Sequence, residues 1–250
     1  MKQLENILAE FDPLSLSEIN DVKLMNRIDR KYWFHSSCLE ELLEKSVKHY
    51  DILEINGKRL MEYHSVYFDT KDNRMYLEHH NKKLNRYKVR RRTYLETGDH
   101  FFEIKLKTNK KRTIKKRIAT ISSETDIFKK EINFLKRETS FDKIELMNSL
   151  NNRFFRMTLI HKQKQERCTI DIHPEFWKEG KKLELKNLVI FELKKGRSLK
   201  GSPMVSMLRE MKIRQSGLSK YCTGRAFLEP ELKRNAFKSR LRFIEKNILN

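Results

Sequence analysis

The sequence predicts an α+β protein in which about eight antiparallel strands close into a tunnel and helices pack on the outside. Several short segments alternate basic and apolar residues, as in Glu103-Ile104-Lys105-Leu106-Lys107. A strand turns successive side chains to opposite faces, so each segment has one charged and one apolar face. The pattern recurs in both halves of the chain, and apolar residues at helical spacing flank it at both ends.

The expected elements of the first part are two helices, a strand and a third helix. Apolar residues at helical spacing predict a helix over 3–11, ended by Asp12-Pro13, and then a short helix capped by Ser17. Residues 27–34 alternate as a strand, Ser36 or Ser37 caps the next helix, and Asn56-Gly57 marks a turn.

The middle of the chain predicts most of the sheet. Strands are expected over 61–69, 82–93, 101–107 and 112–119, and outer helices over 124–150. A second group of strands follows over 154–162, 166–172, 181–186 and 188–194. Ser202-Pro203 begins another helix, and the basic amphipathic tail from Pro230 predicts a helix that closes one end or flank of the tunnel. A helix that lies on a membrane surface is the alternative for this tail.

Composition favours one folded domain over 1–250, with a core of about 22–225, N-terminal helices over 1–20 and a C-terminal helix over 230–250. Seven Gly and four Pro leave no evident linker. The three cysteines lie far apart, which excludes a paired zinc site and fits a reducing compartment. Without an apolar run of membrane-spanning length, a cytoplasmic location is expected. The formal charge of +21 predicts phosphate-rich partners.

The charged faces of the predicted strands point to an anion site. Lys88, Arg90 and Arg92 share one face, and Glu103, Lys105 and Lys107 share a face of the next strand, about 4.8 Å away. Lys115, Arg117, Arg156, Arg167 and Lys194 extend the pattern to other strands. A solvated outer face is the alternative, but the continuous apolar faces opposite favour a charged interior. Arg and Lys gathered in an interior require an anion, and polyphosphate fits them best.

Two carboxylates stand beside bases on these faces, Glu103 before Lys105 and Glu192 before Lys194. Each either neutralises its neighbour or binds Mg²⁺ or Mn²⁺, which prefer oxygen ligands. The sequence has no phosphate-binding Gly-rich loop with Gly-Lys-Ser/Thr, no kinase signature, and no convincing nucleophilic triad. Phosphoryl transfer needs little more than positioned cations and a metal.

Eight short motifs, in this order, resemble the polyphosphate polymerase domain of vacuolar transporter chaperone (VTC) proteins, within the CYTH-like triphosphate tunnel metalloenzymes. They are Asp29-Arg30-Lys31-Tyr32-Trp33, Tyr67-Phe68-Asp69-Thr70, Val89-Arg90-Arg91-Arg92, Phe102-Glu103-Ile104-Lys105, Ile114-Lys115-Lys116-Arg117, Arg167-Cys168-Thr169-Ile170-Asp171, Phe191-Glu192-Leu193-Lys194 and Leu218-Ser219-Lys220-Tyr221. The resemblance covers about 25–225.

The resemblance implies an eight-stranded triphosphate tunnel that transfers the terminal phosphoryl group of ATP to polyphosphate with Mn²⁺ or Mg²⁺. It implies a phosphate-binding set of Lys31, Arg90, Arg92, Lys105, Lys115, Arg156, Arg167 and Lys220, and Glu192 as metal ligand. Lys88, Glu103, Lys107, Arg117 and Lys194 complete the expected substrate-binding residues. The segment Phe154-Phe155-Arg156 has Phe where the family leads us to expect tyrosine, and the Glu-x-Glu-x-Lys opening of the cyclase and thiamine triphosphatase branch is absent.

Three hypotheses therefore remain from the sequence. The first is a polymerase acting on ATP and polyphosphate, and the second a tunnel hydrolase cleaving triphosphate or a nucleoside triphosphate. The third is a binding module without turnover. Nucleic acid is disfavoured because Phe101, Phe102, Phe155 and Phe191 alternate against the charges, as core residues do. The acceptor, the oligomeric state and a membrane-protein partner stay open.

Overall fold

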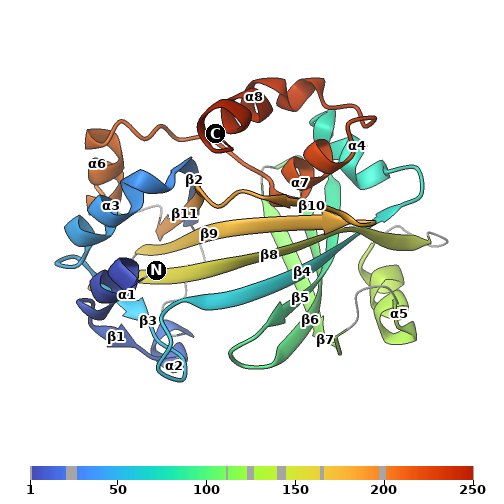
Figure 1. The fold of residues 1–250 in the computed structure, drawn as a ribbon. Coiled ribbons are helices and arrows are strands. Elements are labelled where there is room, and N and C mark those ends of the chain that lie inside the picture. The colour runs from blue at the N-terminus through green and yellow to red at the C-terminus, as the bar shows by residue number, and fades with distance from the viewer. Residues whose placement is uncertain are drawn as a thin grey trace.

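An antiparallel sheet forms the centre of the computed structural model (Figure 1). The structure describes residues 2–20, 27–110, 112–122, 127–139, 145–163, 166–196 and 201–249. Eight strands follow the order β2-β11-β9-β8-β4-β5-β6-β7. They are β2 (Arg27–His35), β4 (Met61–Thr70), β5 (Arg86–Tyr94), β6 (Asp99–Lys107), β7 (Thr113–Ala119), β8 (Leu146–His161), β9 (Glu166–Lys178) and β11 (Leu188–Gly196).

Three short strands extend this sheet. β10 (Lys181–Glu184) pairs with β9, β3 (Tyr50–Leu53) pairs with β8, and β1 (Pro13–Leu14) pairs with β3. Within the described residues, β2 and β7 are the two edges of the eight-strand path. The curl of the sheet nevertheless brings Lys31 of β2 close enough to Lys105 of β6 for their charges to interact. The α+β class and the curled antiparallel tunnel sheet are confirmed.

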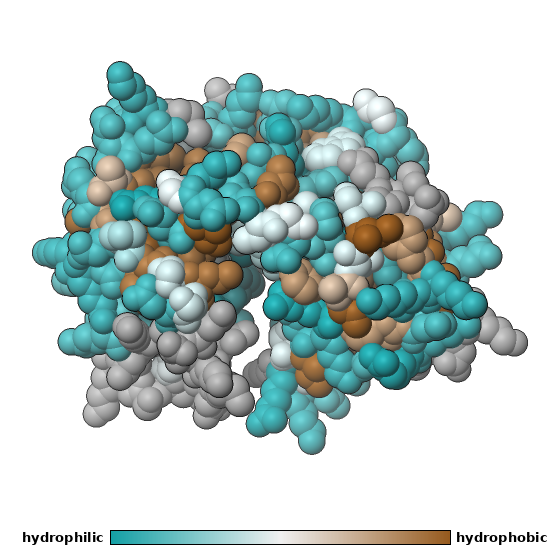
Figure 2. Space-filling view, turned by 90° about the horizontal axis from the view of Figure 1, so that it is seen from below, coloured by the Kyte–Doolittle hydropathy of each residue, from teal (hydrophilic) through white to brown (hydrophobic). Residues whose placement is uncertain are grey.

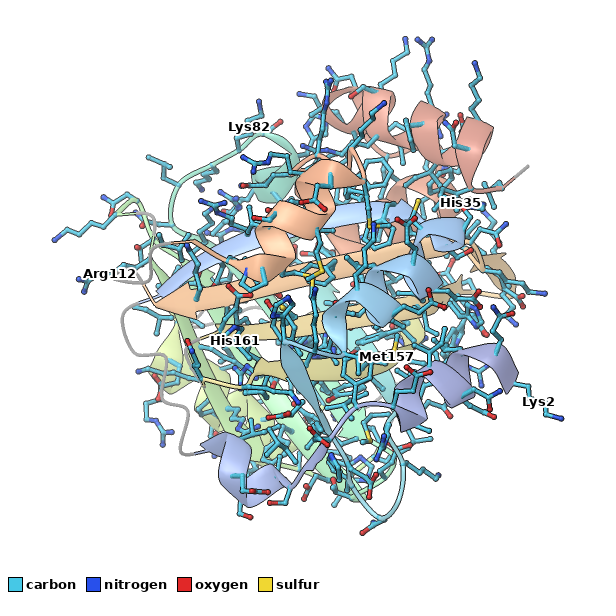
Figure 3. The ribbon with its side chains drawn as sticks, turned by 90° about the vertical axis from the view of Figure 1, so that its left-hand side faces the viewer. Lys2, His35, Lys82, Arg112, Met157 and His161 are labelled. Atoms are coloured by element: carbon cyan, nitrogen blue, oxygen red, sulfur yellow. The ribbon has the colours of Figure 1, made fainter. Side chains whose placement is uncertain are left out.

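The alternation of charged and apolar residues separates the two faces of the sheet, as predicted. Phe102, Ile104, Phe191 and Leu193 are buried on the outer face, and Met157 lies inside the molecule in Figure 3, away from the peripheral Lys82 and Arg112. The charged residues between them face the inner, concave side, which we call the lumen. Burial of the apolar faces beneath helices thus leaves the charged faces to line the lumen.

Helices cover the outer face and one end of the sheet (Figure 1). Those described are α1 (Lys2–Ala9), α2 (Leu16–Asn20), α3 (Leu39–Ser46), α4 (Arg74–His80), α5 (Lys129–Glu138), α6 (Pro203–Glu210), α7 (Lys220–Leu228) and α8 (Lys238–Asn247). Helices α1, α3 and α6 share one apolar cluster with β2, β8, β9 and β11. Helix α5 packs on Phe102 and Ile104, and α4, α7 and α8 share a third cluster.

Helix α7 packs unusually close to the sheet because Gly224 lacks a side chain. A Cβ atom at Gly224 would lie 2.5 Å from the Phe176 ring of β9 and 2.9 Å from Leu150 of β8. Ser219 caps the helix by accepting a hydrogen bond from the Cys222 amide. The close contact lets the first residue of α7, Lys220, reach the lumen.

Several predicted elements need correction. Residues 146–150 belong to β8, not to an outer helix, while residues 124–126 and Ile144 lie outside the described residues. Residues 82–85 precede β5, and helices α4 and α7 were not predicted. Ser17 lies inside α2, and His35, not Ser36 or Ser37, caps the 3₁₀ turn before α3 by accepting from the Ser37 amide.

The surface seen from below in Figure 2 is hollowed between two groups of side chains, with hydrophilic residues along much of its rim. The tail forms a helix, as predicted, and packs on α4 and α7 through Phe237, Leu241 and Ile244. Of the helices in the described ranges, none combines the length and the apolar character needed to cross a bilayer.

Candidate functional site

The first group in the lumen is built on three neighbouring strands. Arg90 of β5 and Lys115 of β7 both bind Glu103 of β6, which lies between them. Arg90 donates through Nε at 2.7 Å and lies 2.6 Å from the same oxygen through Nη2. Burial raises the pKa of Glu103, but the charges of Arg90, Arg92 and Lys115 outweigh it, so the pKa lies well below its ordinary value. Glu103 is therefore a permanent anion that positions two cations.

A second group joins the other half of the sheet to α7. Arg156 of β8 donates to Asp171 of β9 through Nε at 2.5 Å and Nη2 at 2.8 Å, and Lys220 binds the same carboxylate. Burial opposes the charge of Asp171, but Arg156 and Lys220 lower its pKa below the ordinary range. The two groups have the same plan, in which one buried carboxylate orients two cations toward the lumen.

The third group lies where the curled sheet brings β2 and β11 toward β6. Lys31 Nζ is 2.8 Å from Glu192 Oε1, and the charges of Lys31 and Glu192 both act on Lys105. Burial disfavours the charge of Glu192, but the nearby Lys194, Lys31 and Lys105 lower its pKa to about 2. Glu192 is thus ionised at neutral pH.

Aromatic rings form part of the lumen wall beneath the cations. Tyr63 and Phe154 stack with centroids 5.3 Å apart. Arg92 and Arg156 lie over both rings at 4.9–5.4 Å, and the Lys220 ammonium lies 4.2 Å from the Phe154 centroid. The ring faces attract these cations and fix their positions. Phe154 is wholly buried, so this ring is unavailable to stack with a nucleic-acid base.

Like charges stand opposite one another along the lumen. The β5–β6 register pairs Lys88 with Lys105, and the β6–β7 register pairs Lys105 with Lys115. Lys194 of β11 faces Arg167 of β9 in the same way. Like charges in directly opposed positions destabilise a sheet, so this arrangement costs stability when the lumen holds no anion.

The lysines respond to this crowding by becoming weaker bases. Lys105 is accessible from the lumen but enclosed by protein, and burial together with Arg90, Lys31 and Lys88 lowers its pKa to about 7 despite Glu192. Burial likewise lowers the pKa of Lys115 to about 8, although Glu103 opposes the change. The pKa values of Lys88, Lys194 and Lys220 are also lowered, in each case chiefly by burial. A bound anion would relieve both effects.

The sequence matches the VTC domain over residues 26–229. The chain belongs to the VTC domain family. In this VTC domain the matched range contains all eight strands of the curled sheet and ends with α7, so α8 lies beyond it.

Solved structures with a similar arrangement come from distant proteins. A putative adenylyl cyclase from Hippeastrum, described as having a dominant triphosphatase activity, shares 13% identity at a TM-score of 0.47, covering 80% of this chain and 96% of its own. A putative adenylate cyclase from Vibrio parahaemolyticus shares 9% at 0.46, covering 78% and 94%. The PH1819 protein from Pyrococcus horikoshii shares 13% at 0.45, covering 82% and 99%. No curated protein matches significantly, so membership rests on the domain match.

The structure places most of the predicted site residues of the VTC domain in the lumen. Direct contacts or charge interactions link Lys31, Lys88, Arg90, Arg92, Glu103, Lys105, Lys115, Arg156, Arg167, Glu192, Lys194 and Lys220. Arg117 is opposite Glu103 in the β6–β7 register and Lys107 is the last residue of β6; both are exposed, as are Lys105 and Lys115. Arg117 covers the Phe101 ring at 4.1 Å, so Phe101 shares the charged face and is not an opposite-face core residue.

Four residues that contact these cations were missed as site residues. Asp171 binds two of them, Ser65 accepts from Arg92 Nε at 3.1 Å, and Ser219 accepts from Lys88 at 2.8 Å. Tyr67 is buried, which raises its pKa, but Arg90, Arg92 and Lys220 outweigh burial and lower it. Asp171, Ser219 and Tyr67 all occur within the recognised motifs, so their positions beside the basic residues were the available signal.

Glu192 is a lumen carboxylate of this VTC domain that could take part in metal binding. In the described ranges, no group of three or more His, Cys, Asp or Glu side chains is arranged to hold an ion. Glu192 is ionised and reaches the lumen beside Lys31. One carboxylate with phosphate oxygens and waters is a common way to hold Mg²⁺, so the residues fit a metal that arrives with phosphate.

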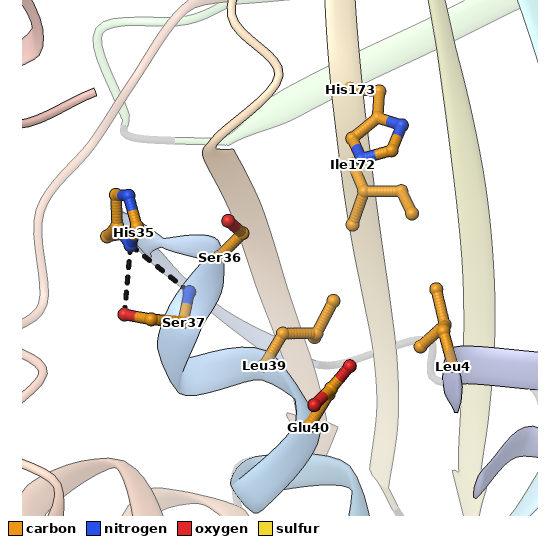
Figure 4. A pocket seen from close by; sticks show the side chains of 8 residues that line it. All are labelled: Leu4, His35, Ser36, Ser37, Leu39, Glu40, Ile172 and His173. Atoms are coloured by element: carbon orange, nitrogen blue, oxygen red, sulfur yellow. Dashed lines mark hydrogen bonds between the residues drawn. The ribbon is translucent and has the colours of Figure 1, made fainter. Parts of the chain in front are cut away.

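A separate pocket of about 340 Å³ lies outside the lumen (Figure 4). Its lining includes His35, which accepts from the Ser37 amide at 3.1 Å, together with Leu39, Ile172 and His173. No Lys or Arg lines it. The pocket therefore lacks the charge of a phosphate site, and the lumen remains the candidate functional site of this VTC domain.

Proposed function

We propose that this VTC domain transfers the γ-phosphoryl group of ATP to a growing inorganic polyphosphate chain held in the lumen. The observation that carries the proposal is the row of opposed like charges, Lys88 with Lys105 and Lys105 with Lys115. Glu103 and Glu192 offset part of this repulsion, and an anion with several charges in the lumen would offset the rest. A linear phosphate chain has that charge.

The proposed reaction is a direct transfer between two phosphates. A terminal oxygen of the acceptor chain bonds to the γ-phosphorus of ATP, the bond from that phosphorus to the β–γ bridging oxygen breaks, and ADP leaves with the electron pair. Charge on the transferred group is stabilised by positioned cations. Glu103 and Asp171 keep Arg90, Lys115, Arg156 and Lys220 oriented before substrate arrives, so little reorganisation is needed.

Glu192 is the proposed protein ligand for Mn²⁺ or Mg²⁺. When bound, the metal would neutralise phosphate charge and help to align the two phosphates. Lys31 would then exchange its contact with Glu192 for a phosphate oxygen, because the metal would take its place beside the carboxylate.

The proposal is tested with two neighbouring lysines on β7. Purified wild type, Lys115→Ala and Lys116→Ala are incubated with ATP and Mn²⁺ or Mg²⁺, and polyphosphate, orthophosphate and ADP are separated. Lys115 binds Glu103 in the lumen, whereas Lys116 binds Glu138 outside it. We expect Lys115→Ala to lower kcat/KM about 100-fold, the order seen when one donor to a transition-state oxygen is removed. Lys116→Ala should stay within about twofold of wild type.

The products decide between the polymerase and its alternatives. Polyphosphate and ADP formed together by wild type support the transfer. Orthophosphate without chains would replace it with the hydrolase, and binding of tripolyphosphate without turnover under either metal would leave an anion-binding module. An equal loss in both lysine variants would contradict the assignment of the lumen as the active site.

A further inference from the structure

A further group of cations, separate from the three groups in the lumen, lies where β5 begins and β6 ends. The β5–β6 register sets Arg86 directly opposite Lys107, one pair beyond Lys88 and Lys105 on the same face. Arg86 donates to neutral acceptors, His79 Nδ1 at 3.2 Å and the Lys83 carbonyl oxygen at 2.6 Å. The repulsion between opposed cations therefore continues past the lumen toward the end of the sheet.

The pKa of His79 shows how strongly this end of the sheet is charged. Burial lowers its pKa first, and the charges of Lys88, Arg86, Lys107 and Arg240 lower it further, to about 2. The imidazole is thus neutral, and because Nδ1 accepts from Arg86, its hydrogen is on Nε2. Arg86, Lys107 and Arg240 carry positive charge and His79 carries an N–H donor, and this combination is typical of an anion site.

The charge of Arg240 acts on His79 because α8 is fastened to α4. The Ala236 amide donates to His80 Nε2 at 3.1 Å, and Tyr76 donates to the Lys233 carbonyl oxygen at 3.1 Å. The Phe237 ring packs against Tyr76, His79 and His80 with centroids 5.3–6.5 Å apart. Figure 1 shows α8 above α4 and α7 at this end of the molecule. Arg240 follows residue 229, where the family match ends.

Lys88 lies between the lumen cations and this further group of cations. It lies two residues from Arg90 and two from Arg86 on one face of β5, at intervals of about 6.6–6.8 Å along the strand. Its ammonium binds Ser219, the residue before Lys220. The cations thus form a continuous row from Arg90 through Lys88 to Arg86, with Lys107 and Arg240 beside its end.

We propose that His79, Arg86, Lys107 and Arg240, here called the mouth cluster, bind the part of a linear phosphate chain that extends beyond the lumen. The proposal rests on the proposed function in one respect, that the lumen itself holds phosphate. It adds a substrate preference: the protein binds long chains more tightly than tripolyphosphate, and α8 supplies part of the difference.

The test compares tripolyphosphate with a long polyphosphate of defined length by calorimetric titration, with wild type, Arg240→Gln, Lys107→Gln and the double variant. Arg242→Gln is the matched control, since two residues along a helix turn the side chain by about 200°. We expect each single variant to weaken long-chain binding roughly two- to fivefold, as for one partly exposed ion pair. The double variant should lose about tenfold. Tripolyphosphate binding should change less than twofold in all of them.

The outcomes separate this inference from the proposed function. Equal weakening of both ligands, or full long-chain affinity in the double variant, would overturn the mouth cluster. A Lys115→Ala variant that loses tripolyphosphate binding would at the same time uphold the lumen site. A wild type that binds neither ligand would overturn the proposed function and the mouth cluster together. Equal weakening of long-chain binding in Arg242→Gln and Arg240→Gln would show that net charge, and not the position of Arg240, accounts for the loss.

Discussion

At the scale of single residues, the lumen combines permanently charged groups with groups that titrate near neutral pH. Glu103 and Asp171 stay ionised because neighbouring cations outweigh their burial, and Arg90 and Arg156 stay protonated because Glu103 and Asp171 outweigh theirs. Lys105 and Lys115 are different, because burial and neighbouring cations bring their pKa values to about 7 and about 8. The charge of the lumen therefore depends on pH within the range in which proteins work.

Phosphate binding should weaken as pH rises from 6 to 9. Both lysines are charged at pH 6, and each loses its proton as pH passes its pKa, so above pH 8 a phosphate chain must first restore those protons. Binding at pH 7.5 should accordingly take up protons, which calorimetry in buffers of different ionisation enthalpy measures. The stability of the free protein should change in the opposite sense to phosphate affinity and rise with pH. Lysines in the unfolded chain hold their protons to higher pH than Lys105 and Lys115 do in the folded protein, so loss of those protons favours the folded state.

A Lys105→Arg variant is the control for the pH dependence. Arginine keeps its charge throughout this range, so proton uptake should decrease by the contribution of Lys105 and the affinity profile should flatten. Proton uptake of the same size in Lys105→Arg and wild type would show that the ligand's own terminal groups, and not the lysine, titrate.

At the scale of secondary structure elements, buried ion pairs hold the outer helices in place. Arg91, between the lumen residues Arg90 and Arg92, turns to the outer face and binds Glu131 of α5 through Nε at 3.0 Å and Nη2 at 2.6 Å. Arg225 of α7 binds Glu229 and reaches Asp69, which also accepts from Tyr221. These pairs are nearly inaccessible to solvent, so they fix α5 and α7 against the strands that carry the site.

An Arg91→Ala variant should lower the free energy of unfolding by about 3–5 kcal/mol. The change leaves Glu131 buried without its main cationic partner, and this uncompensated charge is the cause of the loss. A double variant, Arg91→Met with Glu131→Met, should recover most of it because no buried charge remains. Urea unfolding measures both. Arg137→Ala, which removes an exposed side chain paired with Glu138, should change stability by less than about 1 kcal/mol. A similar small loss in Arg91→Ala would show that α5 does not depend on this pair.

At the scale of the whole molecule, the sheet is a scaffold that holds like charges together at a cost. The outer clusters of apolar residues supply the stability that keeps the strands curled, while the net charge of +21 opposes a compact state. A phosphate chain in the lumen would remove part of that repulsion. Ligand binding and folding stability should therefore be strongly coupled.

Tripolyphosphate should raise the melting temperature by roughly 5–10 °C. A ligand at 100 times its Kd adds about 2.7 kcal/mol, and each kcal/mol shifts Tm by about 2–4 °C for a chain of this size. Scanning calorimetry with and without ligand measures the shift. Sodium chloride at equal ionic strength is the control, since it screens charge without occupying the lumen. An equal shift with sodium chloride would show that general screening accounts for the effect.

The strands were predictable because their signal is local. Residues 101–107 and 188–194 alternate in sequence, and the structure has strands at both places. The helix α7 was missed because Gly224 and the buried Arg225 break its apolar pattern, although both are explained by contacts with Phe176 and Asp69. The start of β8 was misread as helix because Leu146, Met147 and Leu150 are also compatible with helical spacing.

The sequence by itself determined that most of the basic strand residues share one face and that this face is strongly charged, since side-chain direction follows from position along a strand. Only the tertiary structure decided how those charges are partnered. Asp171 meets Lys220 across 49 positions of chain because α7 folds back onto β9, and Lys31 and Lys105 come within range of each other because the sheet curls. Strand register, curvature and the attachment of helices depend on contacts between distant segments, and those contacts are what turned a charge pattern into a site.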